Sequence, residues 1–112
     1  MNTRDERKNV LQGTLDLLIL RTVSHEAMHG WGIMQRLRQL TKDVFQVTPG
    51  SLFPALQRLE ESGWVRGEWG TSENNRKAKF YSITKTGRKQ LAEEEHNWNA
   101  IIAAVASVLE GA

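Results

Sequence analysis

The stretch TPGSLFPALQRLEESGWVRGEWGTSENNRKAKFYSITKTGRKQL, from Thr48 to Leu91, decides the fold. It contains the pattern of a short capped helix, two strands joined by a polar basic tip, and the start of another capped helix. This order is typical of a winged helix-turn-helix, which places a helix and a cationic loop on the same side of a small domain. The predicted fold class is therefore α+β, with three helices, a two-stranded wing and a long C-terminal helix.

The first helix in this stretch begins between Thr48 and Ser51, and Gly63 ends it. With Ser51 as the N-cap, Pro54 falls at the third helical position, where its missing N–H has no intrahelical partner to lose. One arc of this helix is predicted to pack on the preceding helices; it carries Leu52, Leu56 and Leu59.

Upstream, apolar residues at helical spacing predict one helix over residues 14–24, capped by Thr14. A turn at HGWG, residues 29–32, precedes a second helix that ends near Thr41. We therefore expect the helix that begins near Thr48 to be the third of the domain.

Downstream, two strands are predicted over residues 64–69 and 79–83, joined by the polar segment GTSENNRKA. Thr84 then caps a last helix, and Gly87 in its first turn indicates close backbone packing. The predicted domains are a winged helix-turn-helix at residues 10–84 and a dimerisation helix at residues 85–112.

The amino-acid composition limits which kinds of site the chain can form. The 112 residues include no cysteine, which excludes disulfides and thiolate metal sites and suits the cytoplasm. The three histidines are interpreted as turn or helix-end residues, so no metal or other cofactor is expected. Residues 1–9 carry charges of both signs, and no apolar run is long enough to span a bilayer, so we expect neither a signal peptide nor a membrane partner.

Charge is distributed unevenly along the chain. Residues 36–89 carry 11 basic and 5 acidic groups, whereas residues 90–112 carry 4 acidic groups and no basic one. The middle of the chain is therefore the part that would face a polyanion, although such a surplus is often only a solvated surface. The geometry of the predicted fold favours double-stranded DNA as the partner.

The exposed arc of the third helix and the hairpin tip are the predicted DNA-binding elements. Ser51 suits a phosphate, while Gln57 and Arg58 are long enough to reach base edges in a major groove. Phe53 either wedges against the hairpin or touches a thymine methyl group. The residues predicted to contact DNA are Arg36, Lys42, Thr48, Ser51, Phe53, Pro54, Gln57, Arg58, Asn75, Arg76, Lys77 and Lys79.

The last helix carries an apolar stripe that is longer than a small domain can cover, so we expect a homodimer. The predicted interface consists of Leu15, Leu18, Leu91, Trp98, Ile101, Ile102, Val105 and Leu109. The chain shows no carboxylate pair, Ser/His arrangement or glycine-rich phosphate loop, so an enzyme is not expected. Two alternatives to a DNA-binding regulator remain: an interaction module for an acidic protein, and a drug sensor centred on Trp98.

Five segments resemble the PadR family of transcriptional regulators in its short form, with a single C-terminal dimerisation helix. They are LQGTLDLLIL, HGWGIMQRL, TPGSLFPALQRLEESGWV, KFYSITKTGRKQL and the neighbourhood of Trp98. The resemblance implies a homodimeric winged-helix repressor of a palindromic operator. Phe53 departs from the usual tyrosine, which removes a hydroxyl contact to phosphate.

The resemblance also bears on effectors. Some short members of the family hold flat aromatic ligands between paired tryptophans of the C-terminal helices, and Trp98 occupies the matching position. A tryptophan on an apolar helical stripe also fits a dimer core. An effector site for a small planar aromatic compound at Trp98 is thus implied by the resemblance alone.

Overall fold

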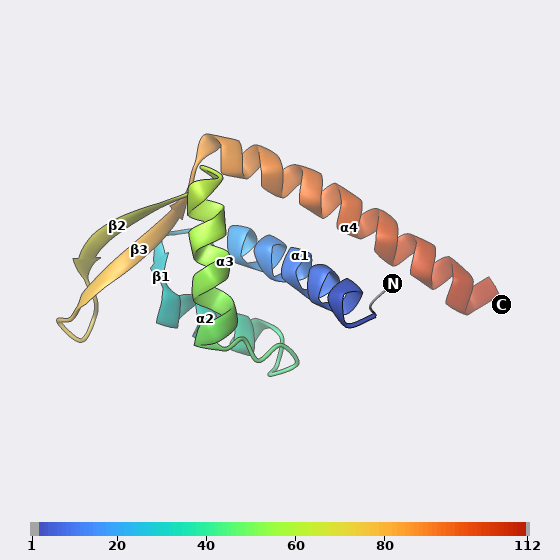
Figure 1. The fold of residues 1–112 in the computed structure, drawn as a ribbon, viewed down its shortest axis with the longest axis horizontal. Helices are drawn as coiled ribbons and strands as arrows, with labels where there is room; N and C mark the ends of the chain where they lie inside the picture. Colours follow the sequence, from blue (N-terminus) through green and yellow to red (C-terminus); the bar gives the residue numbers. More distant parts are fainter. Residues whose placement is uncertain (1–2, 112) are drawn as a thin grey trace.

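The computed structural model describes residues 3–111, with side chains from residue 13 onward. Its elements, in chain order, are α1 (Thr3–Val23), β1 (Met28–His29), α2 (Gly30–Leu40), α3 (Pro49–Glu61), β2 (Val65–Thr71), β3 (Lys77–Ile83) and α4 (Lys85–Gly111). The three strands form one antiparallel sheet in the order β1-β3-β2. In Figure 1 the β2–β3 hairpin and the far end of α4 extend in opposite directions from the packed helices. The predicted α+β winged helix with a long C-terminal helix is confirmed.

The first helix is longer than predicted. α1 begins at Thr3, so Thr14 lies inside the helix and is not its N-cap. Residues 4–8 include arginine, glutamate and lysine, which all favour helices, so the helical segment extends well before the apolar pattern begins.

The HGWG segment is not a turn before α2 but its beginning. His29 is the N-cap, and its Nδ1 accepts a hydrogen bond of 3.0 Å from the Gly32 N–H. This capping bond allows two glycines to lie in the first helical turn despite their low helix propensity. His29 also pairs with Phe80 in the short strand β1, which the sequence pattern did not indicate.

The cap of α3 also differs from the prediction. Thr48, not Ser51, is the N-cap, and its side chain accepts a hydrogen bond from the Ser51 N–H at 3.3 Å. Pro49 therefore takes the first helical position that proline favours, and Pro54 lies inside the helix rather than at its third position. The predicted end is confirmed: Gly63 has a φ of 77°, and the N–H groups of Gly63 and Trp64 donate to the carbonyls of Glu60 and Leu59.

The hairpin strands extend further than predicted, so the tip shortens to residues 72–76. Within this tip the Asn75 N–H donates to the Ser72 carbonyl at 2.9 Å, and Asn75 has a positive φ of 61°. A turn followed by a residue in the left-handed region is a common hairpin connection, and asparagine tolerates that conformation. Lys77 and Lys79 consequently belong to β3 and not to the tip.

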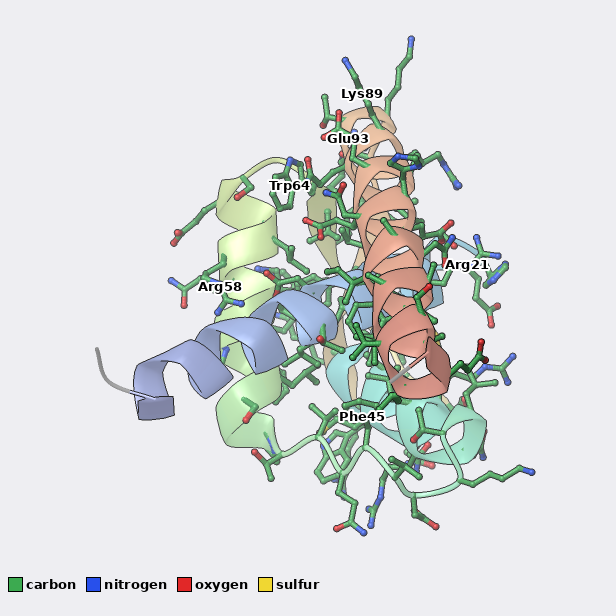
Figure 2. All side chains as sticks on the ribbon, turned by 90° about the vertical axis from the view of Figure 1, so that its right-hand side faces the viewer. Arg21, Phe45, Arg58, Trp64, Lys89 and Glu93 are labelled. Atoms are coloured by element: carbon green, nitrogen blue, oxygen red, sulfur yellow. The ribbon has the colours of Figure 1, made fainter. Side chains whose placement is uncertain are left out.

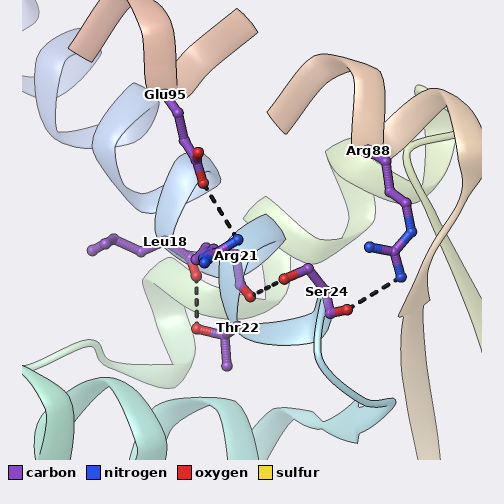
Figure 3. Close-up of polar contacts among 6 residues, drawn as sticks. All are labelled: Leu18, Arg21, Thr22, Ser24, Arg88 and Glu95. Carbon is purple, nitrogen blue, oxygen red and sulfur yellow. Dashed lines mark hydrogen bonds and ion pairs between the residues drawn. The ribbon is translucent and has the colours of Figure 1, made fainter. Parts of the chain in front are cut away.

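Figure 3 shows how the start of α4 is fixed to the end of α1. The Arg88 guanidinium donates to the Ser24 carbonyl at 3.2 Å, and Arg21 lies 3.7 Å from the Glu95 carboxylate. Thr84 caps α4 as predicted, since its Oγ1 accepts from the Gly87 N–H at 3.0 Å. The core beneath is formed by Leu17, Ile19, Leu20, Val23, Ile33, Met34, Leu37, Leu52, Ala55, Leu56, Leu59, Val65, Tyr81 and Leu91.

Candidate nucleic-acid interface

The face of α3 that points away from the core is polar. Leu52, Leu56 and Leu59 are at most 1% exposed, as predicted, which turns Pro54 and Gln57 outward. The Gln57 amide donates to the Glu61 carboxylate one turn later at 3.2 Å, an exposed contact that a stronger partner can replace. This face can therefore enter a groove and offer an amide to base edges.

Ser51 and Thr48 are both exposed at the start of α3. The Thr48 hydroxyl donates to Ser51 Oγ at 3.3 Å, and the Ser51 N–H is used by the cap. The helix therefore presents two hydroxyl groups at its N-terminus, next to the positive end of its dipole.

Arg58 is turned toward α1 (Figure 2). Its Nη2 donates to Asp16 Oδ1 at 2.8 Å, and the two side chains are 38% and 19% exposed. Burial raises the pKa of Asp16, with the charge of Glu94 adding to that effect and Arg58 opposing it. Base reading by Arg58 therefore remains a prediction that requires this ion pair to open.

The wing presents cations on both its tip and its β3 strand. Asn75, Arg76 and Lys77 are exposed, and the Lys77 ammonium lies 5.2 Å from the centre of the Trp69 ring. Lys79 is instead held by Glu60 of α3, with Nζ donating to Oε1 at 2.8 Å, and this bond raises the pKa of Lys79. Lys79 thus ties the wing to α3, while Arg76 and Lys77 face solvent.

A cleft of about 900 Å³ lies between α2, α3 and the wing. Phe53 forms part of its wall and packs on Gly30, because a Cβ atom at that glycine would lie 2.7 Å from the Phe53 ring. The ring is still 45% exposed, so it belongs to this cleft and not to the buried core. The structure brings Phe53 together with Arg76, Lys77 and Lys79 around one cavity.

Two further residues of this cleft were missed by the sequence analysis. Trp31 on α2 and Trp69 on β2 line the cleft, and each is 65% exposed. Trp31 was interpreted as part of a turn and Trp69 as an ordinary strand residue. The only sequence feature that could have singled out Trp69 is its position beside the basic tip, and that position does not show that its side chain is exposed.

The remaining predicted DNA contacts lie outside the cleft. Arg36 is exposed on α2, and Lys42 is exposed in the loop before α3, where it adopts a positive φ of 52°. Neither residue lines the cavity that Phe53 shares with the wing. Contact of these two residues with DNA stays a prediction.

The predicted dimer interface divides into two groups. Leu91 is only 6% exposed and packs in the core of its own chain, which leaves little of its side chain for the predicted interface. Leu91 lies near the start of α4, where that helix packs on α1, whereas the later turns extend beyond the domain (Figure 1). Leu15 and Leu18 are partly buried against the core. The exposed large apolar residues of α4 are Trp98, Ile101, Ile102, Val105, Val108 and Leu109.

In the part of the chain that the structure describes, we find no helix with the length and hydropathy needed to cross a membrane. Residues 19–93 match the transcriptional regulator PadR-like family. The chain belongs to this family. Its members are transcriptional regulators and not enzymes, so the winged helix of this protein serves DNA-binding regulation.

The chain is also similar to individual proteins over most of its length. An uncharacterised protein of Lysinibacillus sphaericus is 29% identical over 105 residues, which cover 94% of this chain and 96% of the relative. A transcriptional regulator of Mycobacterium tuberculosis is 32% identical over 78 residues, 70% of this chain and 69% of the relative. The crystal structure of a PadR-like transcriptional regulator from Bacillus cereus matches with a TM-score of 0.74 at 28% identity, covering 94% of this chain and 96% of that one.

Proposed function

We propose that this PadR-family protein is a repressor that binds a palindromic operator as a homodimer. The observation that carries the proposal is the shared cleft: Phe53 of α3 and Arg76 and Lys77 of the wing line the same cavity. A helix with a polar outer face and a cationic hairpin on the same side of a domain suit a duplex better than a small ligand.

The two elements have different tasks in this proposal. Gln57, at the centre of the exposed arc of α3, reads base edges in the major groove, and Arg58 joins it if the contact with Asp16 opens. Arg76, Lys77 and the exposed hydroxyls of α3 hold phosphates. These roles fall within the proposed DNA-binding domain at residues 10–84.

The proposed dimerisation helix, residues 85–112, supplies the partner contact. Six large apolar side chains of its later turns are exposed, from Trp98 at 37% to Leu109 at 76%. Such a patch is unfavourable in water, and a second copy of the same helix would cover it with matching side chains. A two-fold dimer would present two α3 helices to half-sites about 34 Å apart, one turn of DNA.

We also propose that a small planar aromatic effector binds the protein and releases it from the operator. Trp98 lies on the exposed stripe and keeps over a third of its surface accessible, which leaves a ring available for stacking. A regulator of this kind works in the compartment that holds the DNA, which we take to be the cytoplasm.

Alanine variants separate the two DNA-reading tasks. Replacing Gln57 should cost about 1 to 3 kcal/mol on the operator for each base that is no longer read, and little on random DNA. Replacing Arg76 and Lys77 together should weaken both duplexes and reduce the salt slope by roughly 0.9 for each phosphate that is no longer neutralised. The matched control is Gln39→Ala, since Gln39 is an exposed glutamine of α2 that has no assigned role.

Fluorescence anisotropy with labelled duplexes at several salt concentrations measures these effects. Equal losses on operator and random DNA for Gln57→Ala would make α3 a phosphate clamp and remove its reading role. Binding that never depends on DNA sequence, in the wild-type protein, would instead favour the alternative function, a module whose basic face binds an acidic protein.

A further inference from the structure

Three exposed aromatic side chains line the cleft between α2, α3 and the wing, and none of the three belongs to the buried core. Trp31, Phe53 and Trp69 come from three different elements and are 65%, 45% and 65% exposed. Large apolar groups that gather on one exposed surface mark a contact site more often than isolated ones do. Such a cleft suits an occupant that flat rings can contact.

The charge of the cleft narrows the class of occupant. Its lining includes Arg76, Lys77 and Lys79 against one acid, Glu73. Glu60 neutralises Lys79, whereas the Lys77 ammonium lies over the Trp69 ring at 5.2 Å. The wing wall thus combines an indole face with a cation beside it, which suits an anion attached to an apolar body.

The position of the cleft selects one occupant of this chemistry. If α3 enters the major groove and the wing meets the adjacent minor groove, the sugar–phosphate strand that separates the two grooves must pass between them. The cleft lies between these two elements, so it fits that path. A small ligand would lie beside two tryptophans that are each 65% exposed, whereas small-molecule sites usually bury most of the ligand surface.

We propose that this cleft holds one sugar–phosphate strand of the bound duplex, with Trp31 and Trp69 as uncharged contacts on either side. The inference rests on the proposed DNA-binding function. The indole faces pack on deoxyribose, the Nε1–H groups donate to phosphate oxygens, and Lys77 neutralises the phosphate nearest to Trp69. Phe53, packed on Gly30, forms the apolar wall between them.

Uncharged contacts to a strand have a signature of their own, because they release no counterions and read no base. Trp31→Ala and Trp69→Ala should each weaken operator and random duplexes alike, by roughly tenfold for the removal of a hydrogen bond to a charged group, with an unchanged salt slope. Trp69→Phe should recover part of the affinity, since it keeps the ring and lacks the N–H. Lys77→Ala should instead reduce the salt slope, because it removes a charge that neutralises a phosphate.

The control is Leu40→Ala, which removes an exposed apolar side chain of α2 outside the cleft and should leave both affinities unchanged. Wild-type binding to a selected operator is measured first, so that a failure of the proposed function is recognised separately. Full affinity of both tryptophan variants would overturn the inference, as would a loss confined to the operator, which would make the indoles base readers. A planar aromatic acid that binds the wild type but not a variant carrying both Trp31→Ala and Trp69→Ala, while that variant still binds DNA, would make the cleft a small-molecule site and would also overturn the inference.

Discussion

Gly87 is the position where one methyl group should disturb the junction between the winged helix and α4. A Cβ atom there would overlap the Trp64 carbonyl oxygen and would lie 2.9 Å from Ile83 Cγ1. The carbonyl cannot turn away freely, because it accepts a hydrogen bond of 3.0 Å from the Thr84 N–H. Alanine at residue 87 therefore requires α4 to shift or that hydrogen bond to break.

Two effects of opposite sign decide how much Gly87→Ala changes the free energy of unfolding. Alanine gains about 1 kcal/mol over glycine in a helix. Overpacking against a rigid neighbour costs about 1 to 3 kcal/mol, and a broken buried hydrogen bond adds about 1 kcal/mol or more. We expect Gly87→Ala to lower the free energy of unfolding by about 1 to 3 kcal/mol.

Urea unfolding followed by circular dichroism measures this difference. The control is Gly13→Ala in α1, where a Cβ would have no atom within 4 Å, so that only the propensity gain of about 1 kcal/mol should be seen. If Gly87→Ala stabilised the protein as much as Gly13→Ala, the close approach of α4 to Trp64 would be refuted.

Three further predictions concern the ion pair on α3 and the exposed part of α4. Because burial raises the folded pKa of Asp16 above 3.8, its contribution to stability is present below that value and is lost as pH rises through the folded pKa. Asp16→Asn should abolish this dependence of the free energy of unfolding on pH, measured by urea unfolding from pH 3 to 7. An unchanged dependence would contradict burial of Asp16 as its cause. Ile102→Glu should weaken the proposed dimer by about 3 kcal/mol or more in sedimentation equilibrium, because it buries an unpaired charge. The control Ala103→Glu, on the opposite side of α4, should leave the dimer unchanged. A monomeric wild type would contradict the interface proposal. Trp98→Ala should abolish binding of planar aromatic compounds in calorimetry, and unchanged binding would place the effector elsewhere.

Much of the fold could be predicted from the sequence because its signals are local. Leu52, Leu56 and Leu59 recur at helical spacing and lie in the core, and Gly63 ends α3 with a positive φ. Thr84 and Gly87 have the expected roles at the start of α4. The leucine spacing, the C-terminal glycine and the Thr84 cap each depend on residues within one or two turns of the chain, whereas the backbone that Gly87 approaches belongs to Trp64, far away in the sequence.

The errors occurred where two local signals compete or where the partner is distant in sequence. Thr48 and Ser51 are both good caps, and proline at residue 49 favours the first of them. Asp16 and Arg58 are 42 residues apart, so nothing in the helical pattern of α3 indicates that Arg58 turns toward α1. The exposure of Trp31 and Trp69 likewise depends on how α2 and the wing are placed around α3.

Selection of bound sites from a random pool of duplex DNA tests the central claim most directly. A two-fold dimer that reads one major groove per α3 should enrich an inverted repeat whose half-sites are centred about one helical turn, 34 Å, apart. The enriched duplex should bind at least about a thousandfold more tightly than random DNA at physiological salt. A pool that shows no enriched sequence after repeated rounds, with the protein folded and binding DNA only weakly, would contradict the account.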